Sequence, residues 1–192
     1  MSRRGAALEV AVLGLLHDAP MHGYELRKQV NALLGRGRLL SYGTLYPALK
    51  ALGRAGHIVA DETQPDPESR SKRARIVYRL TAEGKEHFAQ MLEESGPAAW
   101  DDDAFGVRFA FFARTPAAAR VRILEGRRSR LEERLDQVRQ AAQRGRDRAD
   151  AYTRELQRHG LESVEHEISW LSDLIDRERD GGYPDHQDHQ DQ

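Results

Sequence analysis

The spacing of apolar residues predicts three helices in the first part of the chain, over residues 6–17, 24–34 and 41–55. In the second segment the apolar residues recur every three to four positions, as one face of a helix requires: Leu26, Val30, Leu33 and Leu34. The third segment carries an apolar arc of the same kind, made by Leu45, Ala48, Leu49 and Leu52. Residues 18–23, which include Pro20 and Gly23, predict a turn between the first two helices.

Two strands are predicted next, over residues 57–62 and 75–80. In the later strand Ile76, Tyr78 and Leu80 share one face, as period-two alternation requires. A polar loop over residues 63–74 joins the strands, and Thr81 is a suitable N-cap for a fourth helix. Three helices followed by two strands and a helix is the order of a winged helix-turn-helix.

Helical patterns continue beyond Gly96 and Pro97. Residues 101–114 predict a short apolar helix, and Thr115 with Pro116 predicts the start of a long amphipathic helix that ends near Gly145. A second apolar stripe runs over residues 149–178 and passes through Gly160, where a small residue allows another helix to approach closely. The pattern does not decide whether residues 146–180 form one helix or two.

These patterns divide the chain into three parts and predict a mainly α fold. We expect a winged helix-turn-helix domain over residues 1–95, with three helices plus a two-stranded wing. A C-terminal α-helical domain over residues 96–180 is expected to dimerise and is a candidate effector domain. Residues 181–192 are too polar to form a core and are expected to be a disordered tail.

Composition and charge narrow the range of functions. The chain has no cysteine, which excludes disulfides, thiolate zinc sites and cysteine nucleophiles. No apolar run reaches the ~18 residues that a membrane-spanning helix needs. Residues 1–88 hold 14 Lys and Arg against 9 Asp and Glu, whereas residues 89–192 hold 16 against 22. A basic first half can steer toward a polyanion, although ordinary surface charge would look the same.

The third predicted helix has an outer face suited to the major groove of DNA. Opposite its apolar arc lie Thr44, Pro47, Lys50, Ala51 and Arg54, with Tyr46 at the border. A solvated helix face is the alternative for Lys50 and Arg54, and core packing is the alternative for Tyr46. The loop cations Arg70, Lys72 and Arg73 are suited to phosphate contacts, or they are simply part of a mobile charged loop.

Pro47 leaves the start of this helix undecided. If Thr44 is the N-cap, Pro47 lies in the first turn, where its missing N–H costs no helical hydrogen bond. If Ser41 is the N-cap, Pro47 removes one bond and bends the first turn.

Three stretches of the chain resemble the signature sequences of PadR-family transcriptional regulators: PMHGYELRKQV, GTLYPALKALGRAGHI and RIVYRLTAEGKEHF. The resemblance covers roughly residues 8–90, and residues 102–116 and 156–175 are similar to the longer C-terminal helical region of one PadR subgroup. It implies a bacterial, cytoplasmic DNA-binding homodimer, usually a repressor, whose C-terminal helices form the dimer. Regulators of this family often respond to a small molecule, frequently an aromatic one.

By matching position, the resemblance implies that Tyr42, Thr44, Tyr46 and Lys50 lie on or near the DNA-facing helix, and residues 70–73 in the wing. Ala51 and Gly53 depart from the family pattern, in which larger polar or charged residues are common. We therefore expect fewer contacts at the end of this helix. The wing is also long and contains Pro65 and Pro67, which leaves the position of its tip open.

The two long helices supply the predicted dimer interface: Leu124, Leu131, Leu135, Val138, Val164, Ile168, Leu171 and Ile175. Neither helix can cover its apolar face alone, and a two-fold partner subunit is the simplest cover. Five aromatic residues are either core residues or the lining of a pocket for an aromatic effector: Trp100, Phe105, Phe109, Phe112 and Trp170. His22 and Tyr24 are expected to shape the turn and the domain core, and a phosphate contact from the start of the second helix is the alternative.

The sequence therefore predicts a DNA-binding transcriptional regulator and not an enzyme. It contains no catalytic or phosphate-cradling signature, and nothing orders the histidines of the tail DHQDHQDQ, so we expect no cofactor and no metal site. The leading hypothesis is a cytoplasmic homodimeric repressor that a small molecule releases from a pseudo-palindromic operator. The alternative is a helical interaction protein whose winged-helix half binds a protein partner.

Overall fold

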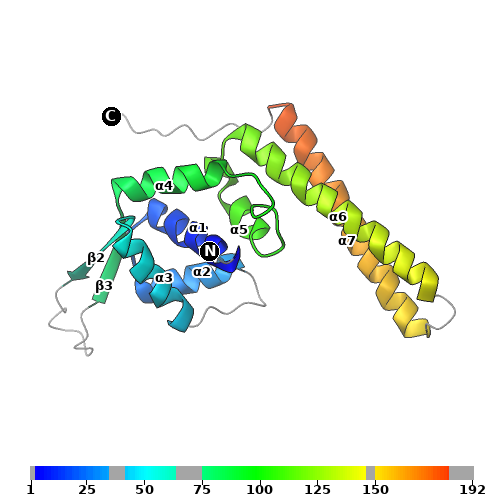
Figure 1. Ribbon diagram of the computed structural model, residues 1–192, viewed down its shortest axis with the longest axis horizontal. Coiled ribbons are helices and arrows are strands. Elements are labelled where there is room, and N and C mark those ends of the chain that lie inside the picture. The colour runs from blue at the N-terminus through cyan, green and yellow to red at the C-terminus, as the bar shows by residue number, and fades with distance from the viewer. Residues whose placement is uncertain (1–2, 35–41, 64–74, 146–149, 182–192) are drawn as a thin grey trace. The chain divides into compact units, whose positions relative to one another are not determined.

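The computed structural model describes residues 3–34, 42–63, 75–145 and 150–181, which form two compact units (Figure 1). Unit 1 comprises residues 1–94 and 101–115, and unit 2 comprises residues 95–100 and 116–192. Residues 101–115 therefore cluster with the N-terminal unit, although they follow the boundary that Gly96 and Pro97 mark in the sequence. The tail over residues 182–192 lies outside the described residues.

Helix α1 (Arg3–Asp18) is the centre of unit 1. It packs against α2 (Gly23–Leu34), α3 (Tyr42–Arg54), α4 (Ala82–Glu93) and strand β3 (Arg75–Leu80). Four consecutive residues of α1 are no more than 1% exposed: Val10, Ala11, Val12 and Leu13. A helix that is buried on all sides has no solvent face, so the other elements surround it.

A three-stranded antiparallel sheet completes unit 1. Strand β2 (Ile58–Thr63) pairs with β3, and Ile58 lies opposite Leu80. A short third strand, β1 (Met21–His22), pairs with the other edge of β3 and gives the order β1-β3-β2. The sequence predicted only a turn and a two-stranded wing, because two residues are too few to show alternation. Strand β1 ties the segment before α2 to the wing.

A close backbone contact fixes the turn between α3 and β2. Gly56, with φ of +79°, follows the end of α3, and the His57 N–H donates to the carbonyl of Leu52 at 3.0 Å. The hydroxyl of Thr81 lies within hydrogen-bond distance of the carbonyls of Gly56 (2.7 Å) and His57 (3.0 Å), and it accepts from the Gly84 N–H at 2.9 Å. A Cβ on Gly84 would stand 2.0 Å from the His57 carbonyl oxygen. Only glycine fits there.

Residues 101–114 form two short helices, α5 (Phe105–Ala110) and the 3-10 helix η1 (Phe112–Arg114), instead of the single predicted one. The guanidinium of Arg108 is buried and donates to the backbone carbonyls of Met91 and Glu94 at the end of α4. Burial lowers the pKa of Arg108, while the Glu94 carboxylate opposes that effect. The Met91 carbonyl also accepts from the Glu94 N–H, at 3.2 Å. The buried cation adds to this cap at the negative C-terminal end of α4.

Unit 2 contains a hairpin of two long helices, α6 (Ala117–Gly145) and α7 (Ala151–Arg179), which lie side by side (Figure 1). Helix α7 is continuous, which answers the question that the apolar stripe left open. Asp150 caps it by accepting from the Thr153 N–H at 2.8 Å. The close approach predicted at Gly160 does not occur within the described chain, since a Cβ there would have no heavy atom within 4 Å. Gly126 is the tight position instead, 2.3 Å from the Trp100 indole by the same measure.

Apolar burial and ion pairs together join α6 to α7. Leu124, Leu131, Leu171 and Ile175 are no more than 2% exposed. Arg120 and Glu178 form an ion pair at 2.9 Å, and their side chains are only 4% and 6% exposed. Arg127 and Glu167 form a second pair, also at 2.9 Å. None of the helices in the described ranges is both long and apolar enough to cross a membrane.

The first prediction concerns the contact between α4 and the α3–β2 turn. We expect Gly84→Ala to lower the free energy of unfolding by about 3 kcal/mol, because its Cβ collides with a backbone carbonyl that cannot turn away. Gly53→Ala is the matched control, since Gly53 also lies in a helix of unit 1 and the nearest atom to its Cβ would be 4.0 Å away. That change should stabilise by up to about 1 kcal/mol. Urea unfolding measures both, and equal effects would contradict the tight contact.

The second prediction concerns the buried ion pair of unit 2. Arg120→Ala leaves the carboxylate of Glu178 buried and unpaired, and we expect it to cost about 3–5 kcal/mol of stability. In the control, Arg139→Ala, the broken pair with Glu165 is about half exposed on both sides, and the cost should be below about 1 kcal/mol. Thermal unfolding would contradict the prediction if both substitutions shifted the transition equally.

Candidate nucleic-acid interface

Helix α3 turns one face toward unit 1 and the other toward solvent. Leu45, Leu49 and Leu52 are no more than 5% exposed. The opposite face consists of exposed residues: Thr44, Pro47, Lys50, Ala51 and Arg54. The burial pattern is the one that the sequence predicted for this helix. The three leucines fix the direction of the exposed face, because rotation of α3 about its axis would bring them into water.

Helix α3 begins at Tyr42, so Pro47 lies inside it. Thr44 therefore lies inside the helix and is not its N-cap. Pro47 has no N–H to donate to the carbonyl of Gly43, four residues earlier. Gly43 is exposed, so water can satisfy that carbonyl. The side chain of Tyr42 lies outside the described part of the structure, so its predicted contact with DNA stays a prediction.

Tyr46 lies at the border of the two faces and is 39% exposed. A Cβ added to Gly23 would stand 3.4 Å from the Tyr46 hydroxyl and 3.3 Å from the ring of Tyr78. Burial raises the pKa of Tyr78, and the neighbouring Tyr46 raises it further, so Tyr78 is neutral near pH 7. Tyr46 therefore packs on the start of α2 along one edge and is open to solvent along the other.

The exposed cations of α3 are available to a ligand. Lys50 and Arg54 form no ion pair or side-chain hydrogen bond with residues in the described parts of the chain. Thr44 is exposed on the same face. The predicted wing cations Arg70, Lys72 and Arg73 lie outside the described residues.

A pocket of about 640 Å³ adjoins Tyr46. It is lined by His22, Gly23, Tyr24, Glu25, Lys28, Tyr46, Ile76 and Tyr78. Hydroxyl, imidazole and ammonium donors gather here at the positive end of α2, an arrangement suited to a phosphate. Glu25 is the single carboxylate in this lining and opposes an anion.

The sequence predicted no DNA contact for Lys28. It predicted that Tyr24 shapes the turn and the core, with a phosphate contact at the start of the second helix as the alternative. Tyr24 is 65% exposed, so the expectation of a core position was wrong. Its ring centroid lies 5.9 Å from the guanidinium carbon of Arg27. The helical spacing places both Tyr24 and Lys28 off the Leu26–Val30 face, and that offset was the available signal for their exposure.

The five candidate effector residues belong to different units. Phe105, Phe109 and Phe112 lie in unit 1. The ring centroid of Phe109 lies 5.8 Å from that of Phe105 and 4.9 Å from that of Phe112. Trp100 and Trp170 lie in unit 2. Neither unit by itself brings all five together. Phe105 and Phe112 are buried and Phe109 is partly exposed, so core packing describes most of the phenylalanine cluster.

The residues predicted for a dimer interface lie in the hairpin of unit 2. Five are buried in the single chain: Leu124, Leu131, Leu135, Leu171 and Ile175. The other three are half-buried: Val138, Val164 and Ile168. The packing of α6 on α7 accounts for this burial without a partner subunit. Two large apolar side chains near the start of α7 are exposed instead, Tyr152 (88%) and Leu156 (72%).

The fold and the exposed face of α3 define the class of this protein as a winged helix-turn-helix protein with a C-terminal helical hairpin. Residues 12–90 match the sequence model of the transcriptional regulator PadR-like family. This match covers less than half of the chain, so residues 12–90 are similar to the PadR-like family of transcriptional regulators. Members of the family are regulators, so the prediction that the chain is not an enzyme is confirmed.

Solved structures with a similar chain include further transcriptional regulators. One from Clostridium thermocellum is 25% identical over 43% of this chain and 74% of its own, with a TM-score of 0.37. Bacillus subtilis PadR, solved in complex with operator DNA, is 20% identical over 89% of this chain and 98% of its own, with a TM-score of 0.43. A PadR-like regulator from Bacillus cereus is 20% identical over 91% and 99%, with a TM-score of 0.39. No curated protein matches the chain.

Proposed function

We propose that this regulator is a homodimeric repressor that binds a pseudo-palindromic operator and is released by a small molecule. The observation that carries the proposal is the outer face of α3, where exposed Thr44, Lys50 and Arg54 lie opposite a buried leucine face. A helix of this kind fits the major groove, where its cations and hydroxyl meet phosphates and base edges. Two copies in successive major grooves would lie ~34 Å apart on one side of the duplex.

The neighbouring surface supports this mode of binding. Lys28 and the border residue Tyr46 line the same pocket as the start of α2, so a phosphate beside α3 would meet several donors there. The wing cations Arg70, Lys72 and Arg73 are proposed to add phosphate contacts. A repressor of this kind blocks polymerase by occupying the promoter, and its place of action is the bacterial cytoplasm.

The third prediction tests the face of α3. We expect Lys50→Ala to weaken binding to the operator by about tenfold or more, because the helix loses a cation at the groove. Lys85→Ala is the matched control, since Lys85 is also an exposed lysine on a helix of unit 1, and its affinity should stay within about twofold. Neither change should alter stability by more than about 0.5 kcal/mol.

The DNA is the region upstream of the protein's own gene, and footprinting followed by titration with a competitor duplex measures specific binding. Equal affinity of the wild type and Lys50→Ala would remove Lys50 from the interface. Loss of affinity in Lys85→Ala to the same degree would indicate non-specific charge attraction instead of recognition by α3.

The dimer is proposed to form through the hairpin, with Tyr152 and Leu156 at the contact. These residues are one turn apart on α7 and therefore share a face. Large apolar side chains exposed together on a helix gain free energy when a partner covers them. A second copy of the chain is the proposed partner, because a two-fold interface lets the same pair meet itself.

The fourth prediction tests this contact. We expect Leu156→Glu to convert the dimer to a monomer, because the interface would bury an unpaired carboxylate. Arg154→Glu places the same side chain on the opposite side of α7, since it is two residues away at about 100° per residue. That control should remain a dimer. Sedimentation equilibrium measures the mass, and a dimer that survives Leu156→Glu would place the interface elsewhere.

The proposed effector is a small aromatic molecule. Phe109 is partly exposed beside Phe105 and Phe112, which offers an aromatic surface in unit 1. Such a ligand would act by binding one spacing of the two DNA-reading helices more tightly than another.

A further inference from the structure

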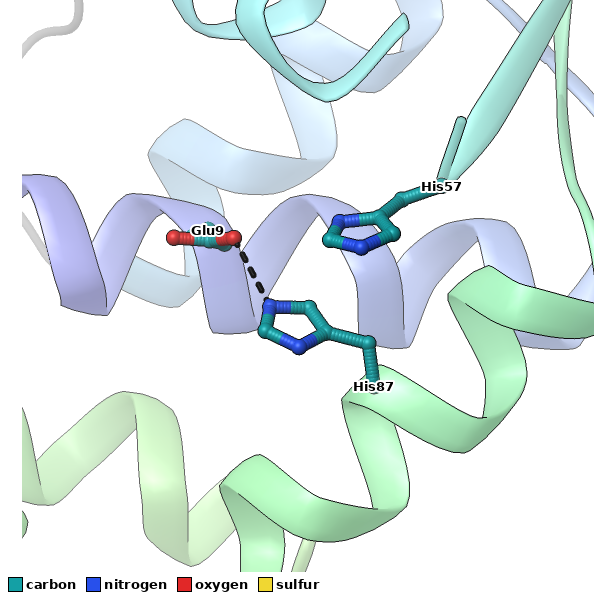
Figure 2. Close-up of side chains that lie close together, drawn as sticks. All are labelled: Glu9, His57 and His87. Atoms are coloured by element: carbon teal, nitrogen blue, oxygen red, sulfur yellow. Dashed lines mark hydrogen bonds and ion pairs between the residues drawn. The ribbon is translucent and has the colours of Figure 1, made fainter. Parts of the chain in front are cut away.

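Three side chains that can bind metal ions lie close together in unit 1: Glu9, His57 and His87 (Figure 2). Glu9 comes from α1, His57 from the turn between α3 and β2, and His87 from α4. The Nε2 atom of His87 lies 3.0 Å from Oε1 of Glu9, although the residues are 78 positions apart in the sequence. The carboxylate side chain is only 12% exposed. The rings of His57 and His87 stack with their centroids 4.1 Å apart and their planes at 19°.

The cluster has a donor set without a full complement of partners. One donor atom from each side chain lies within 4.8 Å of the other two. The Nδ1 atom of His57 is shielded from solvent and has no hydrogen-bond partner among the described residues. A buried nitrogen without a partner costs free energy, which a ligand at this point would recover.

We propose that Glu9, His57 and His87 form a binding site for a divalent transition-metal ion, with Zn²⁺ as the ion that fits best. Two imidazoles and one carboxylate with a water molecule complete a tetrahedral zinc site. Two nitrogen donors disfavour Mg²⁺ and Ca²⁺, which take oxygen ligands.

Zinc binding at this cluster requires side chains to move. Donors on a tetrahedral zinc at bonds of about 2.1 Å lie roughly 3.4 Å apart. His87 and Glu9 lie 3.0 Å apart, so these two donors must separate by about 0.4 Å to reach this spacing. The ring of His57 must turn so that its lone pair and that of His87 point at one centre, so binding breaks the ring stack. The site is therefore proposed to form by rotation of these side chains.

The backbone around His57 is suited to hold such a ligand. Its N–H donates to Leu52 of α3, and its carbonyl accepts from the Thr81 N–H at 3.1 Å, at the start of α4. An ion bound to His57 would therefore join the C-terminal end of α3 to both α1 and α4. The inference concerns metal binding alone and does not require that the chain bind DNA.

The fifth prediction measures this binding in the full chain. His186→Gln and His189→Gln are introduced first, because the tail histidines are alternative ligands. In this background we expect one Zn²⁺ per chain by titration calorimetry. At 100-fold excess over the dissociation constant, zinc should raise the unfolding temperature by on the order of 10 °C. Co²⁺ should give the visible ligand-field bands of a four-coordinate site with nitrogen and oxygen donors.

The variants that test the ligands are His57→Gln, His87→Gln and Glu9→Gln. Each should reduce zinc affinity more than tenfold and abolish the cobalt bands. His159→Gln, which removes an exposed histidine of α7, should change neither. Glu9→Gln keeps the shape of the side chain, and circular dichroism without metal verifies that each variant folds. No zinc binding in the background protein, or undiminished binding in His57→Gln, would overturn the proposal.

Discussion

The winged helix depends on the backbone contact between Gly84 of α4 and the carbonyl of His57. No side chain intervenes, and the distance to a Cβ there would be only 2.0 Å, so the turn after α3 lies directly against α4. The hydroxyl of Thr81 bonds the same turn and also caps α4. The start of α4 thus positions the C-terminal end of α3. The strand β2 leaves the turn in a defined direction, and pairing with β3 follows from it.

Two constraints then determine how α3 is presented. The junction at His57 fixes its C-terminal end, and the burial of Leu45, Leu49 and Leu52 fixes its rotation. The face opposite the three leucines is therefore exposed. The positions of its cations follow from the helix itself and need no ion-pair partner within the protein. The Glu9–His57–His87 cluster adds side chains to the same junction, on the side of α1 and α4. The end of α3 is therefore where the packing of unit 1 meets its proposed surface for DNA.

Local pattern was enough to predict much of this fold. The strand over residues 75–80 and the N-cap at Thr81 follow from alternation and from capping chemistry, both of which act within a few residues. Strand β1 was missed because its partner Tyr78 is distant in the chain. The Glu9–His57–His87 cluster was missed for the same reason, since no spacing in the sequence brings three separate segments together. Arg108 was not assigned a role, because its buried partners are backbone carbonyls of α4, which carry no sequence signal.

The apolar stripe of α7 shows what periodicity can and cannot decide. Periodicity indicates that a face will be covered, but not whether the same chain or another copy covers it. Near the C-terminal end of α7, Leu171 and Ile175 are buried against α6, so the chain itself provides the cover. Near the start of the same stripe, Tyr152 and Leu156 remain exposed. The amphipathic pattern thus extends beyond the surface that the hairpin buries, and that excess of apolar surface is the physical reason to expect a second copy there.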